Sequence, residues 1–195
     1  PKLSSSIKEK KTIEKPQTIN KKNYHLIISP DQIDEWIKEA EEVGEVAVDT
    51  ETSSLDPHQA DLIGVSLSSK IGKACYIPIG HKSSKCIDKN IVIKKLKPLL
   101  EDPSVKKIGQ NIKFDFIVLY KQGITISSME DTMLMSYVLD AGKNRHNMDT
   151  LSEIHLGHKT ISFKEIVGTG KKEINFSDVE ICLLYTSPSP RDPHL

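Results

Sequence analysis

Residues 46–55 read VAVDTETSSL, an apolar run that ends in two acidic side chains. Val46, Ala47 and Val48 have the composition of a buried strand. Asp49 and Glu51 follow two positions apart, and because side chains alternate along a strand they point to the same side. Two isolated carboxylates beside an apolar core are costly unless a cation or protons neutralise them. The stretch therefore predicts a core strand that delivers two acids to one site.

The surrounding sequence predicts a sheet. Three strand-like segments, EVAVDTET (45–52), LIGVSLSS (62–69) and KACYIPIG (73–80), are separated by short polar links. Links of this length favour an antiparallel meander. Two further strands are expected at HLIIS (25–29) and VKKIGQ (105–110).

Helices are expected between and after these strands. Ser29 suits a helix N-cap, with Pro30 at the first helical position and Gln32 completing a capping box, and Gly44 suits the end of that helix. Further helices are predicted at 90–100, 111–120, 131–140 and 148–157. The helix at 111–120 is apolar nearly all round, which predicts that it is buried. The fold class is therefore α/β, a mixed sheet formed by the three-strand meander and further strands, with helices packed on it.

Composition places the chain among globular proteins of a reducing compartment. The three cysteines, Cys75, Cys86 and Cys182, form no CxxC pair, so neither a disulfide framework nor a zinc site is expected. No apolar run is long enough to span a membrane, and the cytoplasm is the expected location. Residues 1–22 are polar and carry a net charge of +5, which leaves −5 on the remainder. We interpret them as a disordered basic linker, with contact to nucleic acid as the alternative to simple solvation.

A third acid follows in the apolar helix. Asp115 comes four residues after Asn111, on the same face of the helix at 111–120. Carboxylate oxygens of this kind suit Mg²⁺ or Mn²⁺, and two such ions about 4 Å apart are able to clamp a phosphodiester. We therefore expect Asp49, Glu51 and Asp115 to hold two divalent cations. The alternative is that the acids lie on the surface or cap helices.

Two longer stretches resemble a known family. VAVDTETSSLDPHQADLIGVSLS and KKIGQNIKFDFIVL resemble the first two motifs of the 3′–5′ proofreading exonuclease domain of bacterial DNA polymerase I. The resemblance continues through YIPIGH, KPLLED, DTMLMSYVLD, RHNMDTLSE and GHKTISFKEIVGTGK, over residues 24–181. It implies a ribonuclease H-like exonuclease fold for residues 23–181. It also implies a linker that joins this domain to a preceding nuclease domain, and a polymerase domain that follows in the same chain.

The resemblance also implies roles for single residues. Asp49, Glu51 and Asp115 match the family's catalytic metal ligands, and Glu51 would also help to position the attacking water. The residues implied to contact the substrate are Leu55, Gln110, Asn111, Phe114, Arg145 and Phe163. Leu55 and Phe163 have plain core packing as an alternative, and Arg145 has a surface cation. Phe114 stands where the family often has Tyr, so stacking is kept and a hydroxyl is lost.

The family pattern ends before its third motif, Tyr-x-x-x-Asp. Position 189, four residues after Tyr185, is Ser, and the chain ends CLLYTSPSPRDPHL. Codons can be chosen for residues 182–192 that reproduce a transposase-type sequencing adapter, so residues 182–195 are interpreted as a non-native tail. Cys182 is then not a native cysteine. A polypeptide without the third motif is expected to bind metal weakly and to cleave little.

The expected function is two-metal hydrolysis of the 3′-terminal phosphodiester of DNA, which releases nucleoside monophosphates. The substrate is a single-stranded or frayed 3′ end, and stacking on aromatic side chains tolerates any base. A monomer is expected. Two alternatives stay open: an exoribonuclease resembling RNase D, and a non-catalytic spacer domain that retains the exonuclease fold.

Overall fold

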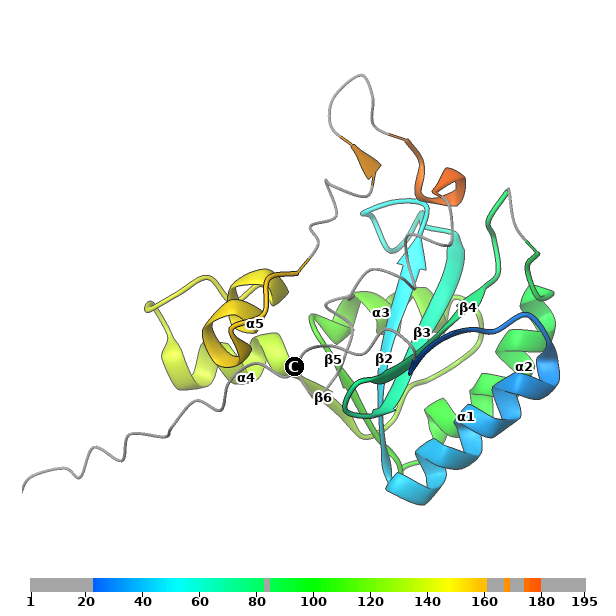
Figure 1. Cartoon of the computed structure of the whole chain (residues 1–195), viewed down its shortest axis with the longest axis horizontal. Coiled ribbons are helices and arrows are strands. Elements are labelled where there is room, and N and C mark those ends of the chain that lie inside the picture. Colours follow the sequence, from blue (N-terminus) through cyan, green and yellow to red (C-terminus); the bar gives the residue numbers. More distant parts are fainter. Residues whose placement is uncertain (1–22, 83–84, 161–166, 169–173, 180–195) are drawn as a thin grey trace, which may run out of the picture.

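The computed structural model describes residues 23–82, 85–160, 167–168 and 174–179 (Figure 1). Within them a six-stranded sheet has the order β1-β4-β3-β2-β5-β6. The strands are β1 Tyr24–Leu26, β2 Glu45–Thr52, β3 Leu62–Lys70, β4 Lys73–Pro78, β5 Lys106–Gly109 and β6 Met129–Asp131. The helices are α1 Pro30–Val43, α2 Lys89–Glu101, α3 Ile112–Tyr120, α4 Thr132–Asp140 and α5 Met148–Leu156, followed by the short 3₁₀ helix Phe176–Asp178.

The sheet is mixed, as the sequence predicts. β2 pairs antiparallel with β3, and β3 pairs antiparallel with β4, so the expected meander is confirmed. β1 joins β4, β5 joins β2 and β6 joins β5, each in parallel. The three-residue β6 was not expected from the sequence, because it is too short to show an alternating pattern.

The predicted start and end of α1 are both confirmed. The Gln32 side chain accepts hydrogen bonds from the backbone N–H groups of Ile28 and Ser29, at 2.9 and 3.1 Å. Gly44 ends the helix with φ of 81°, a left-handed conformation that glycine adopts without strain. Ile33 and Trp36 are buried on the inner side of the helix.

The two faces of the meander differ in character. Val46, Val48, Val65 and Leu67 belong to the main apolar core, to which α1 and α2 also contribute. Figure 1 shows these two helices side by side against the sheet. The opposite face carries small or polar residues, beginning with Asp49 and the facing Ser66. The apolar core therefore fixes β2 from one side and leaves its carboxylates on the other.

The later helices are less enclosed than their sequences suggest. In α3, Val118 and Leu119 are fully buried, but Tyr120 is 61% exposed, so the prediction of a buried helix is wrong at its end. No residue of α4 is buried, and Val138 and Leu139 are 84% and 78% exposed. None of the helices in the described part of the chain has the length and apolar character needed to cross a membrane.

Several expectations lie beyond the described ranges. They concern the linker at 1–22, Phe163, and the tail at 182–195. Of the cysteines that are described, Cys75 is buried and Cys86 is half-buried, and both are free thiols.

Candidate active site

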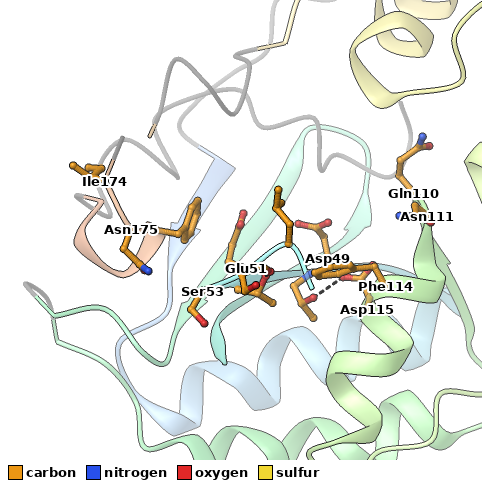
Figure 2. Close-up of a pocket in the computed structure, with 14 residues that line it drawn as sticks. Asp49, Glu51, Ser53, Gln110, Asn111, Phe114, Asp115, Ile174 and Asn175 are labelled. Carbon is orange, nitrogen blue, oxygen red and sulfur yellow. Dashed lines mark hydrogen bonds between the residues drawn. The ribbon is translucent and has the colours of Figure 1, made fainter. Parts of the chain in front are cut away.

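A pocket of about 730 Å³ opens at the end of β2 (Figure 2). β2 and the loop after it form one side, the start of α3 forms a second side, and residues 174–176 form a third. The lining residues are Asp49, Thr50, Glu51, Thr52, Ser53, Ser54, Leu55, Gln110, Asn111, Phe114, Asp115, Ile174, Asn175 and Phe176. Segments far apart in the sequence therefore meet at one open cavity.

The three predicted acids line this pocket together. Asp49 and Glu51 lie on one face of β2, opposite Ser66 and Gly64 of β3. Glu51 is 5% exposed, so its carboxylate is held in a largely dehydrated position. Asp115 reaches the same pocket from the first turn of α3, and Figure 2 shows Asp49 between Glu51 and Asp115.

Asp115 is held by the residue between the two strand acids. Thr50 donates two hydrogen bonds to Asp115 Oδ1, from its backbone N–H at 2.8 Å and from its hydroxyl at 2.7 Å. Burial and the negative charge of Asp49 together raise the pKa of Asp115 to about 8, against the opposing effect of the Thr50 hydrogen bonds. Asp49 and Asp115 are therefore close enough for each to disfavour the charge on the other.

This electrostatic conflict is the kind that a divalent cation relieves. Carboxylate oxygens are hard donors that suit Mg²⁺ or Mn²⁺, and the repulsion between Asp49 and Asp115 marks a place for positive charge. In the described residues, no group of three or more His, Cys, Asp and Glu side chains is arranged so that it could hold a metal ion. The donor chemistry of the acids fits a cation, but their side chains do not form a finished ligand set in this structure.

Two apolar residues that line the pocket, Leu55 and Phe114, differ in how far they are buried. Leu55 is 86% exposed, so the alternative that it is a core residue is wrong. A side chain with this exposure contributes almost no burial free energy to folding. Its position in the pocket lining makes it available to a ligand. Phe114 is half-buried, packs on the main core and also lines the pocket.

The side chain of Gln110 is engaged within the protein. Its amide nitrogen donates to the His146 carbonyl at 2.8 Å, and its amide oxygen accepts from the Thr132 hydroxyl at 2.5 Å. Asn111 adopts φ of 57°, a left-handed conformation that Asn tolerates better than most residues. Its backbone N–H donates to the Asp131 carboxylate at 3.0 Å, which fixes the start of α3.

Arg145 does not line the pocket. It is exposed on the segment between α4 and α5, directly before His146. Because Gln110 holds the carbonyl of His146, the segment that carries Arg145 is attached to the pocket rim.

Several lining residues were not identified from the sequence. Ser53 and Ser54 lie on the loop after β2, and Ile174, Asn175 and Phe176 form the far side of the pocket. Asn175 accepts two hydrogen bonds from Ser177, a local turn that the sequence NFSD does suggest. Nothing in the spacing of residues 174–176, however, connects them to β2.

Sequence comparison identifies relatives of this chain. A family model described as "3′–5′ exonuclease" matches residues 24–186. DNA polymerase I of Pseudomonas aeruginosa is 41% identical over 165 residues, which are 82% of this chain and 18% of that protein. DNA polymerase I of Rhizobium leguminosarum is 43% identical over 170 residues, 76% of this chain and 17% of that protein. The chain therefore spans less than a fifth of the length of these curated relatives.

Solved structures with a similar fold include nucleases. A Trypanosoma brucei RNase D in complex with RNA U12 matches with a TM-score of 0.68 and 14% identity, over 88% of this chain and 60% of that one. Brucella melitensis NrnC with bound Mg²⁺ matches with a TM-score of 0.59 and 23% identity, over 88% of this chain and 74% of that one. The fold class predicted from the sequence is thus confirmed.

Proposed function

Because the chain belongs to the family of 3′–5′ exonuclease domains found in DNA polymerase I, we propose that its pocket removes nucleotides from the 3′ end of DNA as a proofreading site. The observation that carries this proposal is the convergence of Asp49, Glu51 and Asp115 on one open pocket. The pocket volume, about 730 Å³, suits a nucleotide-sized ligand.

The family is metal-dependent, and the related NrnC structure holds Mg²⁺. We assign the cation site to Asp49, Glu51 and Asp115, with two Mg²⁺ or Mn²⁺ ions as the expected number. When bound, such ions supply positive charge that makes water a better nucleophile and stabilises the departing oxygen. Cation binding would require Asp115 to lose the proton that burial and Asp49 favour.

The chain's own residues bind and orient the strand. Leu55 packs against the terminal base and Phe114 offers a ring for stacking, which explains why any base is accepted. The Glu51 carboxylate orients the attacking water. Strand separation costs less free energy at a mismatched end than at a paired end. A site that accepts only a frayed strand therefore removes mismatched nucleotides preferentially.

The polar residues on the α3 side of the pocket have two roles. The Asn111 side chain contacts the terminal nucleotide. Gln110 also keeps the segment with Arg145 at the rim through its bond to the His146 carbonyl, and Arg145 then faces the substrate phosphates. Phe163 is expected to pack on a base, although it lies outside the described residues.

The full-length protein would supply the partner domains. The curated relatives are DNA polymerases whose chains extend far beyond this region, so we expect a polymerase domain in the same chain. A monomer in the cytoplasm remains the expectation. Sequence relatives favour DNA over an RNA substrate, since the likeness to RNase D rests on the fold at 14% identity.

An Asp49→Ala variant of the full-length protein tests this function. It should lose 3′ trimming of a mismatched primer and keep DNA synthesis, while Glu45→Ala, at the other end of β2, should keep both. Trimming that survives in Asp49→Ala would refute the site assignment. Trimming of RNA but not of DNA by the parent protein would favour the RNase D-like alternative, and no trimming of either would favour a spacer domain.

The sequence as printed contains no Tyr-x-x-x-Asp motif. We therefore expect this exact polypeptide to hydrolyse a single-stranded oligonucleotide very slowly in Mg²⁺ or Mn²⁺. Turnover close to that of a related domain with the complete motif would show that the remaining acids suffice.

A further inference from the structure

A buried polar pair lies behind the pocket and has no role in the chemistry described above. Tyr76 of β4 and His81, which follows that strand, are 3% and 6% exposed. The Tyr76 hydroxyl lies 2.6 Å from His81 Nε2, and the two rings meet edge to face at 5.7 Å between centroids. Because the pair is buried and hydrogen-bonded, each side chain restricts the position of the other.

Tyr76 reaches toward the strand that carries the acids. It pairs with Ser66, which in turn pairs with Asp49, so these residues share one face of the sheet. Gly64 is the residue opposite Glu51, and a Cβ atom there would stand 2.1 Å from the Tyr76 hydroxyl. The missing side chain therefore makes room for the Tyr76 hydroxyl next to the Glu51 position.

His81 faces the other side of the pocket. Its ring lies 5.9 Å from that of Phe176, which lines the pocket and is itself 3% exposed. The next residue continues the attachment: Lys82 donates from its backbone N–H to the Ser177 carbonyl at 3.0 Å, and its ammonium lies 2.9 Å from Asp178. Residues 174–176, the far wall of the pocket, are thus held at the end of β4.

The protonation states suit a fixed hydrogen bond. Burial lowers the pKa of His81, and the backbone of Val179 only partly offsets this effect. Burial also raises the pKa of Tyr76, followed by the charges of Cys86 and Asp49. At neutral pH a neutral imidazole therefore faces a protonated phenol, so that Tyr76 donates and His81 Nε2 accepts.

We propose that Tyr76 and His81 are positioning residues that set the distance between the Asp49–Glu51 strand and the 174–176 wall, and thereby the affinity of the pocket for a DNA 3′ end. This inference rests on the proposed function. The pair touches neither the substrate nor the scissile bond. It acts through Phe176 on one side and through its place beside Glu51 on the other.

The test uses four single variants of the full 195-residue chain. His81→Ala removes the acceptor, His81→Gln offers another acceptor, Tyr76→Phe removes the donor, and His155→Ala is a control on the exposed side of α5. Dissociation constants for a fluorescent single-stranded oligonucleotide, blocked against hydrolysis at its 3′ linkage, are measured in Mg²⁺. Amide hydrogen exchange of residues 176–179 is followed in the same samples.

We expect His81→Ala and Tyr76→Phe to weaken oligonucleotide binding by about three- to tenfold, the effect of one lost buried hydrogen bond. His81→Gln should recover most of the affinity, and His155→Ala should match the parent. A double variant with both changes should bind no more weakly than either single variant, because the pair acts as a unit. Amide hydrogen exchange at residues 176–179 should be faster in His81→Ala and in Tyr76→Phe than in the parent, and unchanged in His81→Gln and His155→Ala.

Unchanged affinity in His81→Ala would overturn the inference if the parent chain binds the oligonucleotide. Equal losses in His81→Ala and His81→Gln would also overturn it, since packing rather than the hydrogen bond would then matter. If His81→Ala does not fold, Tyr76→Phe, which keeps the ring, gives the same comparison. If the parent chain does not bind the oligonucleotide, the exchange rates decide: unchanged exchange at 176–179 in both His81→Ala and Tyr76→Phe would overturn the inference. The proposed function is tested separately by Asp49→Ala in the full-length protein, so the two failures can be told apart.

Discussion

Replacing Asp115 with Asn should stabilise the protein in the absence of metal. Burial, reinforced by Asp49, raises the pKa of Asp115 from its ordinary value of 3.8 to about 8. At pH 7 the unfolded chain ionises this carboxyl and the folded chain does not, which costs the fold about 4 kcal/mol. In the variant, the amide oxygen of the new side chain still accepts from Thr50, but its buried NH₂ group offsets about 1–3 kcal/mol of the gain. We therefore expect a net stabilisation of about 1–3 kcal/mol.

The raised pKa of Asp115 also makes the free energy of unfolding depend on pH. Between about pH 4 and pH 8 the folded state of the parent chain binds one proton more than the unfolded state, so its stability falls as the pH rises. The Asp115→Asn variant lacks this dependence. Urea unfolding in EDTA, followed by the fluorescence of Trp36, should show the variant less stable than the parent by about 1–3 kcal/mol at about pH 4, because only the buried NH₂ penalty remains there. The two stabilities should become equal at about pH 5–6, and the variant should be the more stable protein toward about pH 8. Added Mn²⁺ should stabilise the parent more than the variant, because the variant has lost a ligand.

Asp102 provides a control of opposite sign. Hydrogen bonds from Ser104 lower the pKa of Asp102, so its ionised form favours folding. Asp102→Asn should therefore lower stability above the ordinary carboxyl pKa, an effect that disappears as the pH falls. The reasoning about Asp115 would be refuted if Asp115→Asn were less stable than the parent in EDTA at pH 7, or if both had the same pH dependence.

Three further substitutions test other parts of the site. Gly64→Ala should destabilise the fold by about 1–3 kcal/mol, because the new methyl group would stand 2.1 Å from the Tyr76 hydroxyl; an unchanged urea midpoint would contradict this. Leu55→Ala should change stability by less than about 0.5 kcal/mol, since Leu55 is 86% exposed, yet in the full-length protein it should slow trimming of duplex ends more than of single strands. Equal slowing of both would argue against a role for Leu55 in separating the terminal base pair. Thr50→Val removes a hydrogen bond that lowers the pKa of Asp115, so affinity for Mn²⁺ at pH 7 should fall and recover at higher pH; calorimetric titrations at the two pH values would show whether it does.

The sequence predicted the sheet because its signals are local. Each strand of the meander is a short apolar run between polar links, and the capping residues of α1 follow a pattern within four positions. The acids were identified for the same reason, since alternation along one strand places Asp49 and Glu51 together. Asp115 required its position on an apolar helix, and the resemblance to a family then connected the segments.

The remaining features depend on contacts between distant segments. Burial of Leu55 could not be decided from the sequence, because an apolar residue after a strand suits a core and a binding surface equally well. No sequence pattern around Gln110 indicates that its amide nitrogen and its amide oxygen both bind neighbouring segments. Ile174 and Phe176 lie far from β2 in the sequence, and their segment contacts Lys82 and His81, which come much earlier in the chain. Long-range placement of this kind leaves no periodic pattern in the sequence.

The location of bound metal tests the role of the three acids most directly. Crystals of the domain would be soaked with Mn²⁺ and a short single-stranded DNA, and the ions located by anomalous scattering. We predict Mn²⁺ at about 2.0–2.4 Å from carboxylate oxygens of Asp49, Glu51 and Asp115, next to the 3′-terminal phosphate. Oligonucleotide bound in the pocket with no ion at these acids, or Mn²⁺ bound only elsewhere, would contradict the proposal.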